Sequence, residues 1–151
     1  MAALSTSDFL NKVFVNVLGI ALIAFGIFML LSLISYDPYD PSANFIKEAV
    51  VKNWAGVTGA YIAGPIIGFI GLAGIMVVIS TLSWGWNILK ESTFNKIWLK
   101  ITFLSICIPS LSAFFSIIDP FIDVSSNWPT NSHGGFIGAY LNDKLVPIVT
   151  I

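Results

Sequence analysis

The chain lacks the residues on which most catalytic and nucleic-acid-binding sites depend. It contains no arginine, a single cysteine (Cys107) and a single histidine (His133). One cysteine excludes an internal disulfide and any metal site built from several cysteines, and one histidine leaves no second imidazole for a zinc or haem site. Without arginine the chain has no planar fork to grip phosphates. Its net charge of −1 provides no basic surface for nucleic acid.

The sequence signatures of common enzymes are also missing. There is no G-x-x-x-x-G-K-[ST] phosphate loop, no G-x-S-x-G nucleophile turn and no H-E-x-x-H zinc motif. We expect Cys107 to be a small buried hydrophobic residue and His133 to be a solvated turn residue. The sequence therefore predicts no catalytic residue, no cofactor, no metal site and no direct contact of this segment with nucleic acid.

Apolar residues are what the chain has in abundance. They make up 56% of its 151 residues, charged residues make up only 10%, and the mean hydropathy is +0.88. A soluble domain carries about 25% charged residues, so this chain cannot cover its surface with polar groups. We conclude from composition that it is an integral membrane protein whose principal partner is membrane lipid.

Apolar runs of membrane-spanning length recur along the chain. The first, Phe14 to Ser35, has 22 residues, or about 33 Å at 1.5 Å per residue, which crosses the hydrocarbon core and exceeds the apolar part of a cleaved signal peptide. We predict an all-α membrane domain of four spans built as two helical hairpins, with residues 1–13 as a cytoplasmic N-terminus. The expected spans of this domain, 14–151, are 14–35, 61–84, 97–118 and the start of a fourth at about 140–151, which is incomplete in this chain.

Small residues spaced four apart mark one face of the second span. Gly56, Ala60, Gly64 and Gly68 lie along one side of a helix and would leave a groove for another helix. This pattern predicts helix packing, including self-association of the domain. Gly64-Pro65 here and Ile108-Pro109 in the third span are expected to kink their helices without forming a binding site.

Several short motifs occur twice and in the same order. They are Asp37-Pro38-Tyr39 and Asp119-Pro120-Phe121, then Asn53-Trp54 and Asn127-Trp128, then the runs 56–61 and 135–140. The two Asp-Pro pairs are 82 residues apart and the two glycine motifs 79, so the match needs a three-residue deletion. Any one of these repeated motifs could arise by chance. Three in order favour a duplicated hairpin whose two copies face the same way.

Lysine placement predicts the orientation. Lys12, Lys90, Lys96 and Lys100 fall on one side of the predicted spans, against Lys47 and Lys52 on the other. Positive residues stay cytoplasmic, so the N-terminus and the link between spans two and three should lie inside. We expect Lys100 to reach the headgroups from one turn inside its span. We expect residues 143–144 to form an interfacial segment, with a buried Asp–Lys pair as the less favoured alternative.

The loop motifs resemble the N-terminal membrane domain of FtsK/SpoIIIE-type bacterial DNA translocases. The resemblance rests on Ser35-Tyr36-Asp37-Pro38-Tyr39-Asp40-Pro41-Ser42 after the first span, on the run 53–60 before the second, and on the glycine-rich run 134–138 before the fourth. It covers nearly the whole chain, through turn and packing signatures. The residues that it marks are Ser35, Tyr36, Asp40, Pro41, Ser42, Gly59, Gly134, Gly135 and Gly138.

This resemblance implies a four-span anchor in the cytoplasmic (inner) membrane at the division septum. In such proteins a linker and a hexameric ATP-driven motor follow, so the resemblance implies a homo-oligomer, a hexamer, that also contacts other division proteins. The alternative function is a small transporter or channel subunit with a pathway along span two. Such a pathway needs polar groups on one helical face. Span three offers Ser105, Ser110, Ser112 and Ser116, whereas the polar residues of span two lie near its ends.

Overall fold

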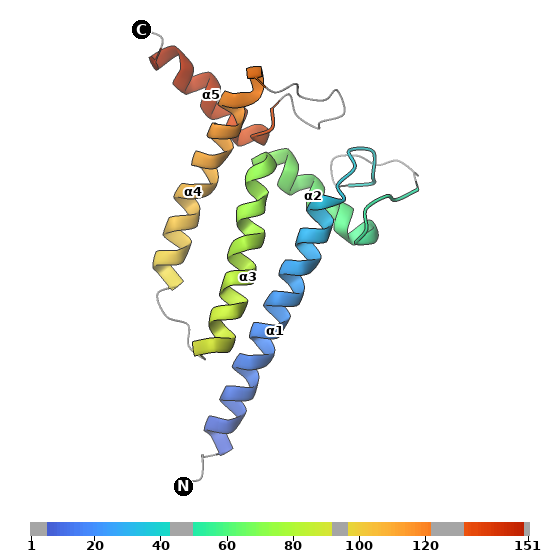
Figure 1. Cartoon of the computed structure of the whole chain (residues 1–151), viewed down its shortest axis with the longest axis vertical. Coiled ribbons are helices and arrows are strands. Elements are labelled where there is room, and N and C mark those ends of the chain that lie inside the picture. Colours follow the sequence, from blue (N-terminus) through green and yellow to red (C-terminus); the bar gives the residue numbers. More distant parts are fainter. Residues whose placement is uncertain (1–5, 43–49, 92–96, 122–131, 150–151) are drawn as a thin grey trace.

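A computed structural model of the chain describes residues 6–42, 50–91, 97–121 and 132–149. These parts are helical and contain no extended sheet (Figure 1). The elements in chain order are α1 (Thr6–Ile34), α2 (Gly56–Ile70), the 3-10 turn η1 (Gly71–Ala73), α3 (Gly74–Glu91), α4 (Ile97–Ile118), the 3-10 turn η2 (Asp119–Phe121) and α5 (Gly135–Val149). The predicted all-α membrane fold is confirmed.

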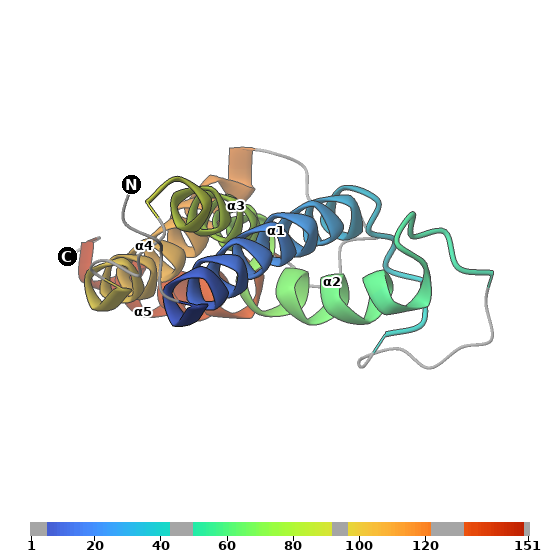
Figure 2. The ribbon, with the colours of Figure 1, turned by 90° about the horizontal axis from the view of Figure 1, so that it is seen from below.

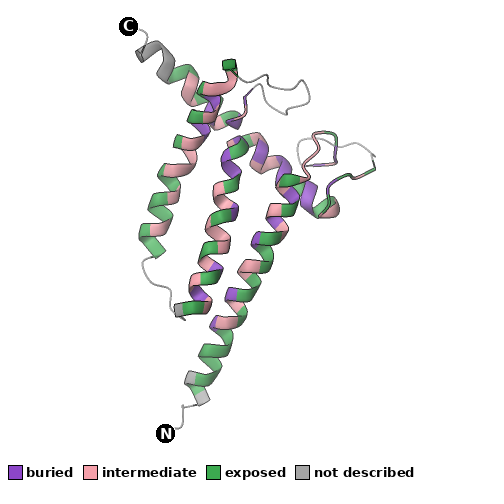
Figure 3. Ribbon diagram, viewed as in Figure 1, coloured by how far each residue is buried: buried purple, intermediate pink, exposed green. Residues whose placement is uncertain are grey.

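Three helical segments are long and apolar enough to cross a membrane. Among the described residues these are Phe9–Ile34, Gly56–Lys90 and Ile97–Phe121, and the fourth helix, α5, has only 15 residues. Large apolar side chains stay exposed along α1 and α4, for example Phe14 at 67% and Phe103 at 66%. Water would disfavour such a surface, whereas lipid tails are as apolar as the side chains themselves. Figure 3 shows the buried residues gathered around α2, η1 and the start of α5.

The second span is divided into two helices. Helix α2 continues through Pro65 and ends at Ile70, and the chain then turns at Gly71, whose φ is +60°. The sequence predicted a kink at Gly64-Pro65; the helix continues through this pair, and the break in the second span lies about two turns later, at Gly71. Figure 1 shows that α2 runs across one end of the domain, whereas α3 lies alongside α1. A left-handed φ of this kind is tolerated by glycine and strains other residues.

Two ends of the domain are distinguished by their charged residues. The beginning of α1, the end of α3 and the beginning of α4 point to the same end of the molecule, with α1 extending beyond the other two (Figure 1). These segments contain Lys12, Lys90 and Lys100. We call this the lysine end. The opposite end holds the segments 35–42, 50–55, 119–121 and 132–134, and we call it the loop end. Figure 2 views the molecule along its length, with α2 extending to one side of the other helices.

Close packing of α1 on α3 depends on glycine. A Cβ built on Gly26 would lie 2.6 Å from Leu82 Cδ2, and one built on Gly19 would lie 2.8 Å from Leu89 Cγ. Gly85 of α3 faces Ile23 in the same way. Small residues of this kind let two membrane helices approach closely, since packing and weak polar contacts hold them together in lipid. Helix α4 packs mainly on α5 and makes far less contact with α3.

Candidate functional site at the loop end

Polar side chains at the loop end tie the end of α1 to the start of α2. The amide nitrogen of Asn53 donates from Nδ2 to the carbonyl of Ser32 at 2.8 Å, and Asn53 Oδ1 accepts from the backbone N–H of Ala55 at 3.0 Å. The hydroxyl of Ser35 accepts from the N–H of Trp54 at 2.9 Å. These bonds satisfy backbone groups that helix ends leave without partners. Residues 32–35 and 53–56 thus form a fixed corner, which we call unit one.

Asp40 fixes the loop that leads into this corner. One of its carboxylate oxygens accepts from the N–H of Lys52 and the other from the N–H of Asn53, both at 2.8 Å. The side chain is only 3% exposed. Both negative oxygens are therefore occupied by backbone donors, an arrangement in which charge-assisted hydrogen bonds are strong. Ser42 is also buried, and a Cβ built on Gly64 would lie 2.8 Å from its Cβ.

A surface ion pair lies above the corner. Lys52 Nζ donates to Asp37 Oδ2 at 2.8 Å. This hydrogen bond lowers the pKa of the Asp37 carboxyl and raises the pKa of the Lys52 ammonium. Burial, together with the charges of Asp37 and Asp40, raises the pKa of the Tyr36 phenol. The Lys52 side chain is 67% exposed, so solvent and salt screen this pair.

The second copy of the motif builds a corresponding corner. The hydroxyl of Ser132 accepts from the N–H of Gly134 at 3.1 Å, and Asp119 Oδ1 accepts from the N–H of His133 at 3.0 Å. Gly135 opens α5 with a φ of +67°, as Gly56 opens α2 with a φ of +68°. Both helices have 15 residues. Residues 116–119 and 132–135 are unit two, and they support the predicted repeat.

The contacts give the repeat a more accurate register than the motifs did. Ser132 bonds the residue two positions on, as Asn53 does, so it is the counterpart of Asn53 at an offset of 79. Asp119 accepts from the residue after Ser132, just as Ser35 accepts from the residue after Asn53. Ser35 and Asp119 are 84 apart, as are the last residues of α1 and α4. The Asp37 and Asp119 motifs are therefore not counterparts, and Asn127-Trp128 lies outside the described residues.

His133 is not the solvated turn residue that the sequence predicted. Its Nδ1 lies 2.7 Å from Asp119 Oδ1, and its side chain is only 17% exposed. The carboxylate of Asp119 also hydrogen-bonds Ser132. The cause is long-range, because Asp119 precedes His133 by 14 residues and meets it only in the folded chain.

Unit two also holds the break in the second span. Turning at Gly71 frees two backbone groups, the carbonyl of Ile70 and the N–H of Leu72. The Ser112 hydroxyl donates to the first at 2.9 Å, and the His133 carbonyl accepts from the second at 2.9 Å. In lipid an unsatisfied backbone group costs several kcal/mol. The break is therefore possible because Ser112 of α4 and His133, two residues before α5, supply partners for it.

Backbones meet directly at this junction. A Cβ built on Gly135 would lie 2.5 Å from the nitrogen of Gly71 and 2.8 Å from the carbonyl carbon of Phe69. A Cβ on Gly138 would collide with the carbonyl of Ser112 on α4. We call the contact of residues 70–72 with Ser112 and residues 133–135 the junction. The sequence offered one signal for it, the Gly71-Leu72-Ala73-Gly74 run inside an apolar stretch, and that signal was missed.

The residues marked by the sequence motifs gather at the loop end. Ser35, Asp40 and Ser42 hold unit one, with Tyr36 half-buried and Pro41 beside them. Gly59 is buried against Asn53, Ala55 and Ser32. Gly134, Gly135 and Gly138 are buried at the junction.

The four small residues of the second span are not equivalent. Ala60 and Gly64 are buried within the chain, Gly56 has open space where a Cβ would be, and Gly68 is half-buried. The buried face of α2 is formed by Gly59, Ala60, Ala63, Gly64 and Ile67. This face packs on the chain itself.

Serines of the third span, proposed above as the lining of an alternative polar pathway, make hydrogen bonds within the protein. Ser105 and Ser110 donate to carbonyls of their own helix, at 2.9 and 2.7 Å, and Ser112 donates to Ile70 at the junction. Cys107 is half-buried beside α3. Asp143 and Lys144 are exposed on α5, so they do not form a buried pair. In the described part of the chain, no group of His, Cys, Asp and Glu side chains could hold a metal ion.

Comparison with known proteins gives one consistent result. Residues 11–151 match the family described as the 4TM region of DNA translocase FtsK/SpoIIIE. A DNA translocase FtsK of Rickettsia typhi is 27% identical over 138 residues, which cover 89% of this chain and 18% of that protein. Proteins of the same name from Shewanella oneidensis and Azospirillum brasilense are 28% identical over 125 residues and 35% over 86. The match to the Shewanella protein covers 80% of this chain and 13% of that protein. The match to the Azospirillum protein covers 55% of this chain and 14% of that protein.

The chain thus spans less than a fifth of the length of these relatives. The matched family is a membrane region, which agrees with the three membrane-capable helices. No solved structure matches the chain.

Proposed function

Because this chain belongs to the family of the 4TM region of DNA translocase FtsK/SpoIIIE, we propose that it anchors such a translocase in the bacterial inner membrane. The family match confirms the resemblance drawn from the loop motifs. The observation that carries the proposal is that the match runs from residue 11 to residue 151 and so includes all three membrane-capable helices. In the whole protein, the anchor would hold an ATP-driven DNA motor at the division septum during chromosome segregation.

The proposed orientation has the N-terminus and the lysine end in the cytoplasm. It is supported by the placement of Lys12, Lys90 and Lys100 at one end of the helices, since positive residues stay on the cytoplasmic side. The loop end would then face the periplasm. A motor that follows the anchor and acts on chromosomal DNA needs the C-terminal end of the anchor on the cytoplasmic side, and with the N-terminus also inside this would need an even number of spans.

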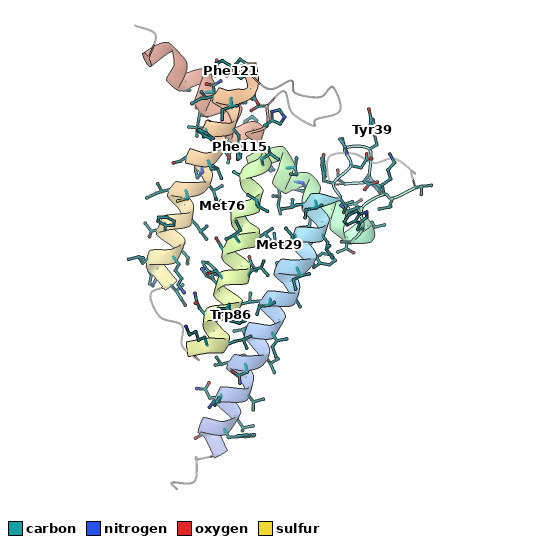
Figure 4. The ribbon with its side chains drawn as sticks, viewed as in Figure 1. Met29, Tyr39, Met76, Trp86, Phe115 and Phe121 are labelled. Atoms are coloured by element: carbon teal, nitrogen blue, oxygen red, sulfur yellow. The ribbon has the colours of Figure 1, made fainter. Side chains whose placement is uncertain are left out.

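The proposed partners are further copies of the anchor, six in total, and other division proteins. Exposed aromatic side chains at the loop end support a protein-facing role there. Tyr39, Trp54 and Phe121 are 50%, 72% and 85% exposed, and Figure 4 shows Tyr39 and Phe121 at this end. Aromatic side chains are enriched in protein interfaces, and they also anchor helices at the membrane surface.

Localisation in dividing cells tests the proposal. The full chain, fused at its C-terminus to a fluorescent protein, should concentrate at the division site of a host bacterium. Asp40→Ala, which disrupts unit one, should reduce that enrichment while leaving the fusion in the membrane, and Lys12→Gln at the other end serves as the control. A fusion spread evenly around the membrane of constricting cells would contradict a septal anchor.

A further inference from the structure

A groove separates α3 from α4 on the lysine side of the junction. Two cavities of about 430 and 310 Å³ adjoin there and share Met76, Phe103 and Cys107. Figure 4 shows Met76 between the two helices. Lys100 and Trp84 line the cavity nearer the lysine end, and Phe114 lines the other.

The repeat explains why a helix does not close this groove. At the offset of 84, Gly19 and Gly26 of α1 correspond to Phe103 and Ser110 of α4. The glycines admit Leu89 and Leu82 and let α3 approach, whereas the large ring of Phe103 takes the position on α4 that corresponds to Gly19 and lines the groove. A packed helix therefore fits this face poorly, and a thin flexible chain fits it better.

The charge of the groove identifies the kind of molecule that would occupy it. Apart from Ser110, the lining is apolar away from the lysine end. Near the lysine end, Lys100 lies one turn into α4 and lines the groove together with Trp84 of α3. Phe114 lies 14 residues beyond Lys100, or about 21 Å, which exceeds half of the ~30 Å hydrocarbon core. The groove thus has a cation at the headgroup level and an apolar part as deep as one leaflet. This combination complements an amphiphile with a negatively charged head.

We propose that this groove binds an anionic phospholipid, with its phosphate held by Lys100 and one acyl chain lying along α4 from Phe103 to Phe114. Basic residues beside helices attract anionic lipids on the cytoplasmic face. The binding site is separate from the loop end, and it does not depend on which partners the anchor has.

Photo-crosslinking tests this site directly. The full chain is reconstituted in phosphatidylcholine vesicles that contain a trace of phosphatidylglycerol or phosphatidylcholine with a diazirine near the end of one acyl chain. Adducts on residues 103–114 should be about fivefold more frequent with phosphatidylglycerol, the effect of one lysine charge near an anionic lipid. Lys100→Gln should abolish this excess, and Lys90→Gln, at the same end but outside the groove, should preserve it.

Several results would overturn the proposal. Equal labelling by the two lipids would show a slot without preference for charge. An excess that persists in Lys100→Gln, or that disappears equally in Lys90→Gln, would show a general surface effect. Absence of adducts in the groove, with adducts on the exposed face of α1, would show that a helix of another copy or of another protein covers it.

Discussion

The two units of the loop end build the same corner with different side chains. Unit one uses Ser35 and Asn53 where unit two uses Asp119 and Ser132. Both open their second helix with a left-handed glycine. Unit one faces open space at that glycine, whereas unit two contacts the break at Gly71. Backbone geometry is thus repeated more faithfully than residue type, and only unit two has the added task of holding the second span.

The largest expected effect is the difference in stability cost between alanine substitutions at the two glycines that open α2 and α5. Gly56→Ala should cost about 1–2 kcal/mol, because only the left-handed backbone is strained. Gly135→Ala should cost this amount and roughly a further 1–3 kcal/mol, because its methyl group overlaps the backbone at Gly71 and Phe69. Unfolding in mixed micelles with increasing dodecyl sulfate, followed by circular dichroism, gives both free energies. Equal costs for the two substitutions would mean that Gly135 does not contact the backbone at Gly71.

A second comparison concerns the carboxylates beside the two corners, that of Asp40, which is buried, and that of Asp119, which is partly buried. Asp40→Asn should cost about 1–3 kcal/mol, since one of two backbone donors would then face an amide NH₂. Asp119→Asn should cost less, because a single oxygen accepts both contacts from His133 and an amide oxygen can replace it, so that only the hydrogen bond with Ser132 is at risk. Hydrogen exchange at the amides of Lys52 and Asn53 should accelerate in the first variant alone. Acceleration in both would contradict the independence of the two units.

Ser112 provides a smaller and more specific test of the junction. Ser112→Ala leaves the carbonyl of Ile70 without its donor and should cost about 0.6–1.7 kcal/mol, the range found for such bonds within membranes. Ser110→Ala on the same helix removes a hydroxyl that bonds only its own turn, and it should cost close to nothing. The difference between the two variants in the same micelle titration is the measured quantity. A Ser110 variant as unstable as the Ser112 variant would remove the junction as the cause.

The surface pair of unit one should give the smallest effect, as a pH dependence. The pKa of Asp37 is lowered from its usual 3.8, so its contribution to stability is present above that pH and is lost as pH falls through the lower folded value. The pKa of Lys52 is raised from 10.5, so its contribution is lost only as pH rises beyond that value. The melting temperature of the wild type should approach that of Asp37→Asn below about pH 3.8. A constant difference between the two from pH 7 to pH 3 would argue against the pair.

Features that depend on local composition could be predicted from the sequence. The spans follow from apolar length, and the repeat was visible because turn residues and glycines are confined to few conformations. The family resemblance rested on the same residues. The resulting fold class is correct, and the motif residues do gather at one end.

Features that depend on distant partners could not be predicted. The break at Gly71 is stable only because Ser112 and the carbonyl of His133 satisfy the groups that it frees. His133 is partly buried where it contacts Asp119, which lies 14 residues earlier in the chain. The glycine motifs gave the offset of 79 that also relates Asn53 to Ser132, whereas no residue pattern revealed the offset of 84 that relates Ser35 to Asp119, because the side chains differ.

Disulfide formation across the junction tests the central claim most directly. In a Cys107→Ser background, Leu72→Cys combined with His133→Cys places two thiols on residues joined by a 2.9 Å backbone hydrogen bond. Ile23→Cys combined with Gly85→Cys, across α1 and α3, serves as the reference pair. We predict that mild oxidation in vesicles crosslinks both pairs within each chain at similar rates. Crosslinking of the reference pair alone would contradict an interlocked junction.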